Sequence, residues 1–108
     1  MIRWNEAHVG ERKIIEYLLA PAHPVGGAKA AYFMGLGYRI DEWTRLRDDL
    51  TYIAENGEVI DVDATTYGLK MIVDGSVEAP CGRMMTLRTV WISDGPDAAP
   101  RLVTAYPS

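Results

Sequence analysis

The sequence predicts an α+β domain in which three N-terminal helices pack on one face of a C-terminal antiparallel β-meander of about four strands. Apolar residues recur at helical spacing up to residue 56 and alternate with polar residues from residue 58 onward. Segments rich in glycine and proline separate these stretches. Helices followed by a run of strands are typical of α+β proteins. The length of 108 residues suits a single domain over residues 1–108.

The three predicted helices span residues 11–20, 29–36 and 41–56. The first should end at Pro21, because a proline pushes the residue before it out of the α region. The second should end at Gly37, which is well placed for a left-handed cap.

The third helix has the clearest pattern. Asp41 is a suitable N-cap, and Asn56 with Gly57 supplies the stop. Its apolar residues recur at steps of three and four: Trp43, Leu46, Leu50 and Ile53. We expect these to face the sheet and the acids of the same helix, Asp48, Asp49 and Glu55, to face water.

Apolar and polar residues alternate with a period of two through the second half of the chain. The predicted strands cover residues 60–63, 69–74, 84–93 and 101–106. The segment 80–83 predicts a turn, and 95–100 predicts a longer loop with proline at both ends.

Charge is uneven along the chain. The net charge is −4, yet residues 41–63 hold eight acids against two arginines. An acidic chain argues against non-specific nucleic-acid binding, which needs a broad basic surface. The acidic helix face from Asp41 to Glu55 could instead meet a basic partner protein.

The sequence also predicts the cellular compartment of the protein. The apolar runs are far shorter than the roughly 20 residues of a membrane span, and the N-terminal residues lack the apolar region of a secretory signal. The single cysteine, Cys81, favours a reducing compartment. We therefore expect a cytoplasmic protein without a membrane partner.

Several candidate functional residues lie at or near His23 in the sequence. Its ordinary pKa of about 6.5 suits a general acid or base. Lys29 lies in the first turn of the second helix, where a cation opposes the helix dipole. The backbone N–H groups of Gly26 and Gly27 could hold an anion or phosphate beside it.

A second group depends on how the last two strands pair. With an even antiparallel register, Arg88 shares a sheet face with Thr104 and Tyr106. An arginine, a hydroxyl and a phenol on one face suit a phosphodiester, because the guanidinium stabilises developing negative charge. Lys70, also out of phase with its apolar neighbours, is a further anion-binding candidate.

No metal or cofactor is expected. Glu55, Glu58, Asp61 and Asp63 straddle a helix end and a strand without a calcium-loop pattern, and we interpret them as a solvated face. The chain contains no dinucleotide fingerprint, phosphate-binding loop or nucleophile elbow.

Residues that carry a family resemblance run through nearly the whole length of the chain. They include Asn5-Glu6-Ala7, Lys13, Tyr17-Leu18-Leu19, His23-Pro24, Gly26, Lys29-Ala30, Phe33, Leu36-Gly37-Tyr38, Trp43, Leu46, Leu50, Tyr67-Gly68, Lys70, Val73-Asp74-Gly75, Gly82-Arg83, Arg88-Thr89-Val90-Trp91-Ile92 and Pro100-Arg101-Leu102-Val103-Thr104-Ala105-Tyr106-Pro107. In these residues the chain resembles DUF6883, a family of small uncharacterised bacterial proteins. The resemblance brings no established activity with it.

The ending of the chain, residues 101–107, also looks like the C-terminal strands of toxin ribonucleases of the barnase, EndoU, colicin and RelE type. That resemblance implies metal-independent RNA cleavage by scattered side chains on one sheet face, although the acidic balance departs from the basic character common among such toxins.

Two hypotheses follow from the sequence. The first is a ribonuclease-like toxin domain acting on RNA, with catalytic residues His23, Arg88, Thr104 and Tyr106 and with Lys29, Gly26, Gly27 and Lys70 binding phosphate. The alternative is a non-catalytic binding protein of a two-protein bacterial module, whose partner would be a small protein encoded nearby.

Overall fold

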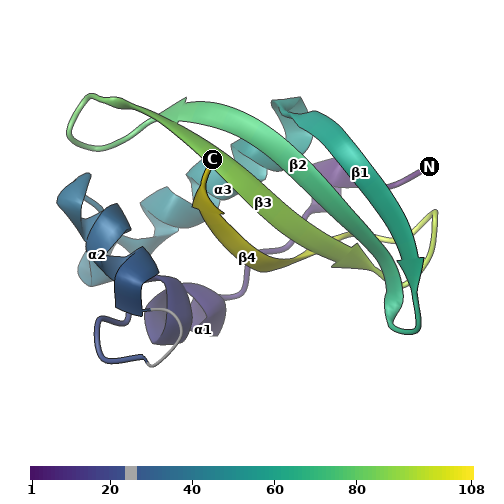
Figure 1. Ribbon diagram of the computed structural model, residues 1–108, viewed down its shortest axis with the longest axis horizontal. Coiled ribbons are helices and arrows are strands. Elements are labelled where there is room, and N and C mark those ends of the chain that lie inside the picture. The colour runs from purple at the N-terminus through teal and green to yellow at the C-terminus, as the bar shows by residue number, and fades with distance from the viewer. Residues whose placement is uncertain (24–26) are drawn as a thin grey trace.

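The computed structural model describes residues 1–23 and 27–108 (Figure 1). Helical elements come first: η1 (Trp4–Glu6), α1 (Glu11–Lys13), η2 (Ile14–Leu18), α2 (Gly27–Gly35), η3 (Ile40–Glu42) and α3 (Trp43–Asn56). The strands follow: β1 (Glu58–Thr65), β2 (Gly68–Glu78), β3 (Met84–Ser93) and β4 (Arg101–Pro107). The predicted α+β order of N-terminal helices and C-terminal strands is confirmed.

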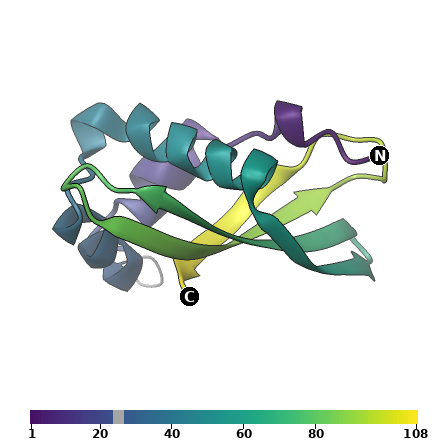
Figure 2. The same ribbon diagram turned by 90° about the horizontal axis from the view of Figure 1, so that it is seen from above.

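The strands form one antiparallel sheet in the order β1-β2-β3-β4. Figure 2 shows α3 along one face of this sheet. We call that face the inner face and the opposite one the outer face. Side chains alternate between the two faces along each strand, so the pairing register decides which residues meet.

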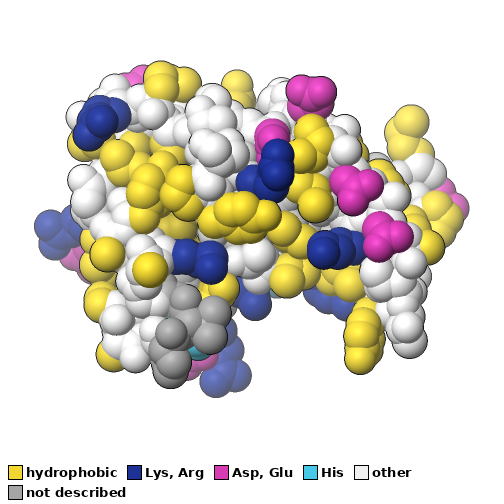
Figure 3. Space-filling view, viewed as in Figure 1, with side chains coloured by type: hydrophobic (Ala, Val, Ile, Leu, Met, Phe, Trp, Pro, Cys, Tyr) yellow, Lys and Arg dark blue, Asp and Glu magenta, His cyan; other side chains and the backbone are white. Residues whose placement is uncertain are grey.

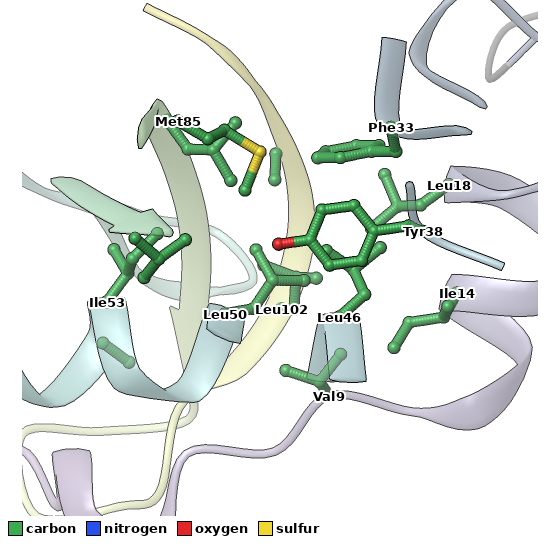
Figure 4. Packing of buried hydrophobic residues seen from close by; sticks show 14 of the residues in the cluster. Val9, Ile14, Leu18, Phe33, Tyr38, Leu46, Leu50, Ile53, Met85 and Leu102 are labelled. Carbon is green, nitrogen blue, oxygen red and sulfur yellow. The ribbon is translucent and has the colours of Figure 1, made fainter. Parts of the chain in front are cut away.

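The hydrophobic core lies between α3 and the inner face. Leu46, Leu50 and Ile53 of α3 are buried, as their spacing predicted. They pack with buried residues of β3 and of the N-terminal helical segment (Figure 4), among them Met85 and Leu18. Burial of such apolar stripes is the main force that holds a helix on a sheet.

The first predicted helix is α-helical in its first part and π-helical in its second. After α1 the backbone widens into the π-helical segment η2, where the Leu19 N–H donates to the Ile14 C=O at 2.7 Å. Such π turns are rare and occur frequently at functional sites. Tyr17 lies within this turn. The helical residues end at Leu18, slightly before the predicted end at residue 20.

The start of the third helix differs from its prediction. Asp41 does not cap α3, because it lies in the 3₁₀ turn η3 and its carboxylate accepts two hydrogen bonds from Arg39, at 2.9 and 3.0 Å. Asp49 is also less solvated than expected, since it accepts hydrogen bonds from Tyr38 and Arg45. The predicted cap at Gly37 is confirmed, with a positive φ of 99°. Among the residues described, no helix is long and apolar enough to cross a membrane.

Candidate functional site

Tyr17 is the centre of a group of polar side chains beside β4. Its hydroxyl and that of Thr104 share a hydrogen bond at 3.2 Å and join η2 to β4. The His23 ring meets the Tyr17 ring edge-on, with centroids 5.1 Å apart. The ammonium groups of Lys13 and Lys29 lie 5.2 and 5.5 Å from the centroid of the same ring. We call these five residues the Tyr17 cluster, and all five are half-buried.

The backbone around His23 is held on both sides. The His23 N–H donates to the Ala20 C=O at 3.0 Å, and the Gly27 N–H donates to the His23 C=O at 2.9 Å. A Cβ at Gly27 would lie 2.7 Å from the carbonyl oxygen of Pro21, so a side chain does not fit there. These contacts place the first turn of α2, with Lys29, next to His23.

The cluster perturbs the Tyr17 phenol. Burial has the largest effect and by itself would raise the pKa. The hydrogen bond with Thr104 and the positive charges of Lys29 and Lys13 act in the opposite direction and together prevail. The pKa of Tyr17 therefore lies below its ordinary value of 10.0. A phenol of this kind gives up a proton more readily than an isolated tyrosine.

A second polar group lies on the outer face, and we call its three residues, Asp74, Arg88 and Tyr106, the Arg88 row. Arg88 of β3 pairs in register with Asp74 of β2 on one side and with Tyr106 of β4 on the other. The guanidinium donates two hydrogen bonds of 2.9 Å to the Asp74 carboxylate, from Nε and Nη2. Hydrogen bonding to this carboxylate raises the pKa of Arg88, and the same pairing lowers the pKa of Asp74.

The two groups share one face of the sheet. Thr104 is opposite Val90, two residues along β4 from the pair of Arg88 and Tyr106. Residues two apart on a strand are separated by about 7 Å. Figure 3 shows a band of apolar side chains across the outer face, with Lys or Arg and Asp or Glu side chains on either side of it.

The six sequence-predicted candidates other than glycine divide into three sets. His23, Lys29 and Thr104 meet at Tyr17, and Arg88 and Tyr106 form the neighbouring row. Lys70 lies apart, because it pairs with Ile92, four residues from Arg88 along β3, or about 13 Å.

The two glycine candidates have different outcomes. Gly26 lies outside the described residues. The Gly27 N–H, expected to face an anion, is instead engaged by the His23 carbonyl.

Two members of the cluster were missed by the sequence analysis. Neither Tyr17 nor Lys13 is among the site residues that the sequence predicted. Their spacing of four residues places them on one side of a helix, and this is the signal that could have found them. Their contact with Thr104, 87 residues away from Tyr17, has no local signal.

Other features of the described surface lie elsewhere. Two hollows open near Tyr38, Arg39 and Asp41, away from the Tyr17 cluster. Among the described residues, no group of three or more His, Cys, Asp or Glu side chains is placed to hold a metal ion.

Residues 3–108 match the family described as "Domain of unknown function (DUF6883)". The chain belongs to the DUF6883 family. This match covers the Tyr17 cluster, the Arg88 row and the whole sheet, so both polar groups lie within the family domain.

This DUF6883 chain is also similar to a solved structure. One matching chain comes from a "Contact-dependent growth inhibition toxin - immunity protein complex from Klebsiella pneumoniae 342", with a TM-score of 0.72 and 15% sequence identity. The similarity covers 93% of this chain and 98% of that chain. At this identity the likeness concerns the fold. No curated protein matches the sequence.

Proposed function

We propose that this DUF6883 protein is a ribonuclease-like toxin domain that cleaves RNA at the Tyr17 cluster. The observation that carries the proposal is the convergence of an imidazole, a phenol of lowered pKa and two ammonium groups beside a sheet-face hydroxyl. Phosphodiester cleavage needs proton transfer and stabilisation of negative charge. These five side chains offer both.

In the proposed reaction, His23 takes the proton from a ribose 2′-hydroxyl, and the 2′-oxygen attacks the adjacent phosphorus. The bond from phosphorus to the 5′-oxygen breaks, and Tyr17 gives its proton to that leaving oxygen. The products are a 2′,3′-cyclic phosphate and a free 5′-hydroxyl. Lys13 and Lys29 stabilise the negative charge that develops on the phosphate oxygens.

The Arg88 row extends this site. Asp74 occupies two of the five N–H donors of Arg88. The remaining donors are proposed to bind a neighbouring phosphate, with Thr104 and Tyr106 positioning the strand between the two groups. The apolar band of the outer face would receive the bases.

The alternative function is that of a non-catalytic partner in a two-protein module. It is supported by the fold likeness to a chain from a complex that contains both a toxin and an immunity protein. The same likeness suits a toxin equally well. The chemistry of the Tyr17 cluster favours the catalytic member.

The experiment compares the two histidines. We expect His23→Ala to lower the rate of cleavage of a labelled single-stranded RNA by about 10²–10⁴-fold, the usual contribution of a general acid or base. His8→Ala is the matched control, because His8 is exposed and contributes to the fold through its backbone bridge to β4. It should keep nearly full activity, and both variants should melt like the wild type.

The substrate gives a second control. RNA with a 2′-deoxy sugar at the cleavage position should resist the protein, since it lacks the nucleophile. Intact RNA at high protein concentration, or equal losses in the two histidine variants, would contradict the catalytic proposal and favour the binding protein.

A further inference from the structure

The strand β1 forms a bare edge of the sheet. In the described part of the chain it pairs with β2 alone, and all eight of its residues are exposed. Figure 1 shows it on the side of the sheet away from α1 and α2. The N–H and C=O groups that point away from β2 therefore face solvent. An edge of this kind can pair with a strand from another chain.

The two faces of β1 have opposite chemistry. Asp61 and Asp63 share the outer face with their register partners on β2. Val59 and Val62 lie on the inner side, yet 43% and 56% of their surfaces are exposed. A bulge at Ile60 separates the two halves of the strand. A strand added to this edge would meet apolar side chains on one face and carboxylates on the other.

The carboxylates of β1 differ from the aspartates of η3 and α3. Asp41, Asp48 and Asp49 each form an ion pair with a nearby arginine. Among the described residues, no ion pair engages Glu58, Asp61 or Asp63. Of the acids that the structure describes between Asp41 and Glu55, only Glu42 and Glu55 lack an ion pair, whereas all three acids of β1 lack one. Unpaired negative charge is therefore concentrated on β1 rather than on the helix face to which the sequence pointed.

The charge pattern also decides what can bind. A second copy of the chain would bring one acidic β1 against another, and like charges on neighbouring strands are destabilising. Basic side chains on the added strand would instead face Asp61 and Asp63. Tyr67, 80% exposed at the adjacent hairpin tip, adds an aromatic contact of the kind that is enriched at protein interfaces.

We infer that β1 is a docking edge for an extended segment of a partner protein in which basic and apolar residues alternate. The segment adds to the sheet through main-chain hydrogen bonds, its apolar residues cover Val59 and Val62, and its basic residues face Glu58, Asp61 and Asp63. This inference does not depend on the chemistry of the Tyr17 cluster.

The test uses three peptides of about eight residues, the length of β1. One alternates lysine and valine, the second has glutamate in place of lysine, and the third keeps the lysines but carries methyl groups on alternate backbone nitrogens. We expect the first alone to shift the amide NMR signals of β1 and to slow hydrogen exchange at its outward amides. Equal binding of the methylated peptide would overturn strand addition, and so would the absence of any binding at millimolar peptide.

Two charge-reversed variants locate the site. Asp61→Lys with Asp63→Lys should weaken binding of the lysine peptide by about tenfold or more, because two favourable cross-strand pairs become repulsive. The matched control, Asp48→Lys with Glu55→Lys, makes the same charge change on α3 and should bind almost as the wild type does. The opposite ranking would overturn the inference and identify α3 as the acidic surface that binds.

Discussion

The two edge strands of the sheet, β1 and β4, differ in how far other segments of the chain cover them. At the β4 edge, the N-terminal segment bridges the start of the strand, with the His8 N–H donating to the Pro100 C=O at 2.8 Å and the Leu102 N–H donating to the His8 C=O at 2.9 Å. Further along, η2 contacts the strand through Tyr17 and Thr104. At the β1 edge no described segment covers the strand, and every residue is exposed.

Because the two edges differ, the charged side chains near β4 and those on β1 have different roles, which the sequence alone does not reveal. Cations near β4 converge on one phenol and change its proton affinity. The carboxylates of β1 are exposed to solvent and can attract a positively charged partner. A covered edge can hold side chains in a defined geometry, whereas a bare edge offers backbone groups and unpaired charge.

The largest expected effect is on stability. Leu102→Ala on β4 should lower the free energy of unfolding by about 2–5 kcal/mol, because Leu102 is only 6% exposed and packs in the core. Val62→Ala on β1 should change it by less than about 0.5 kcal/mol, as an exposed substitution does. Urea unfolding measures both. Losses of similar size would mean that β1 is as well packed as β4.

A smaller effect concerns proton binding at the covered edge. In a pH titration followed by tyrosinate absorbance, Tyr17 should ionise well before Tyr38, whose pKa is raised by burial and by Asp49. Lys29→Gln should move the Tyr17 step to higher pH, and Tyr17→Phe should remove it. If the first step stays unchanged in Lys29→Gln, the lysine does not act on this phenol.

The same titration has a consequence for stability. The pKa of Tyr17 is lower in the folded chain than in the unfolded chain, so ionisation of Tyr17 stabilises the fold. That contribution is fully present above the unfolded pKa of about 10 and is lost as the pH falls through the folded pKa. Comparing unfolding of the wild type and Tyr17→Phe across this alkaline range measures it.

The smallest expected effect is at the bare edge. Calcium or magnesium at millimolar concentration should leave the melting temperature unchanged, because Glu55, Glu58, Asp61 and Asp63 do not have a chelating spacing. A ligand that binds the native state alone must raise the melting temperature. A clear metal-dependent rise would therefore show that the β1 acids bind cations and would compete with the docking role.

The sequence by itself determined the order and kind of the elements. Helical spacing in α3 identified Leu46, Leu50 and Ile53 as buried, and the change to a period of two placed the strands. Gly37 marked the end of α2. These features depend on residues a few positions apart, whose geometry is set by local backbone conformation.

Only the tertiary structure decided which side chains meet. The acids of residues 41–63 look like one block in the sequence, but the fold pairs Asp41, Asp48 and Asp49 with arginines and leaves the acids of β1 exposed. Tyr17 reaches Thr104 because a π turn and the bulge in β4 place them together across 87 positions of sequence. Strand register, bulges and helix docking come from packing of the whole core, so no local pattern encodes the contacts that result from them.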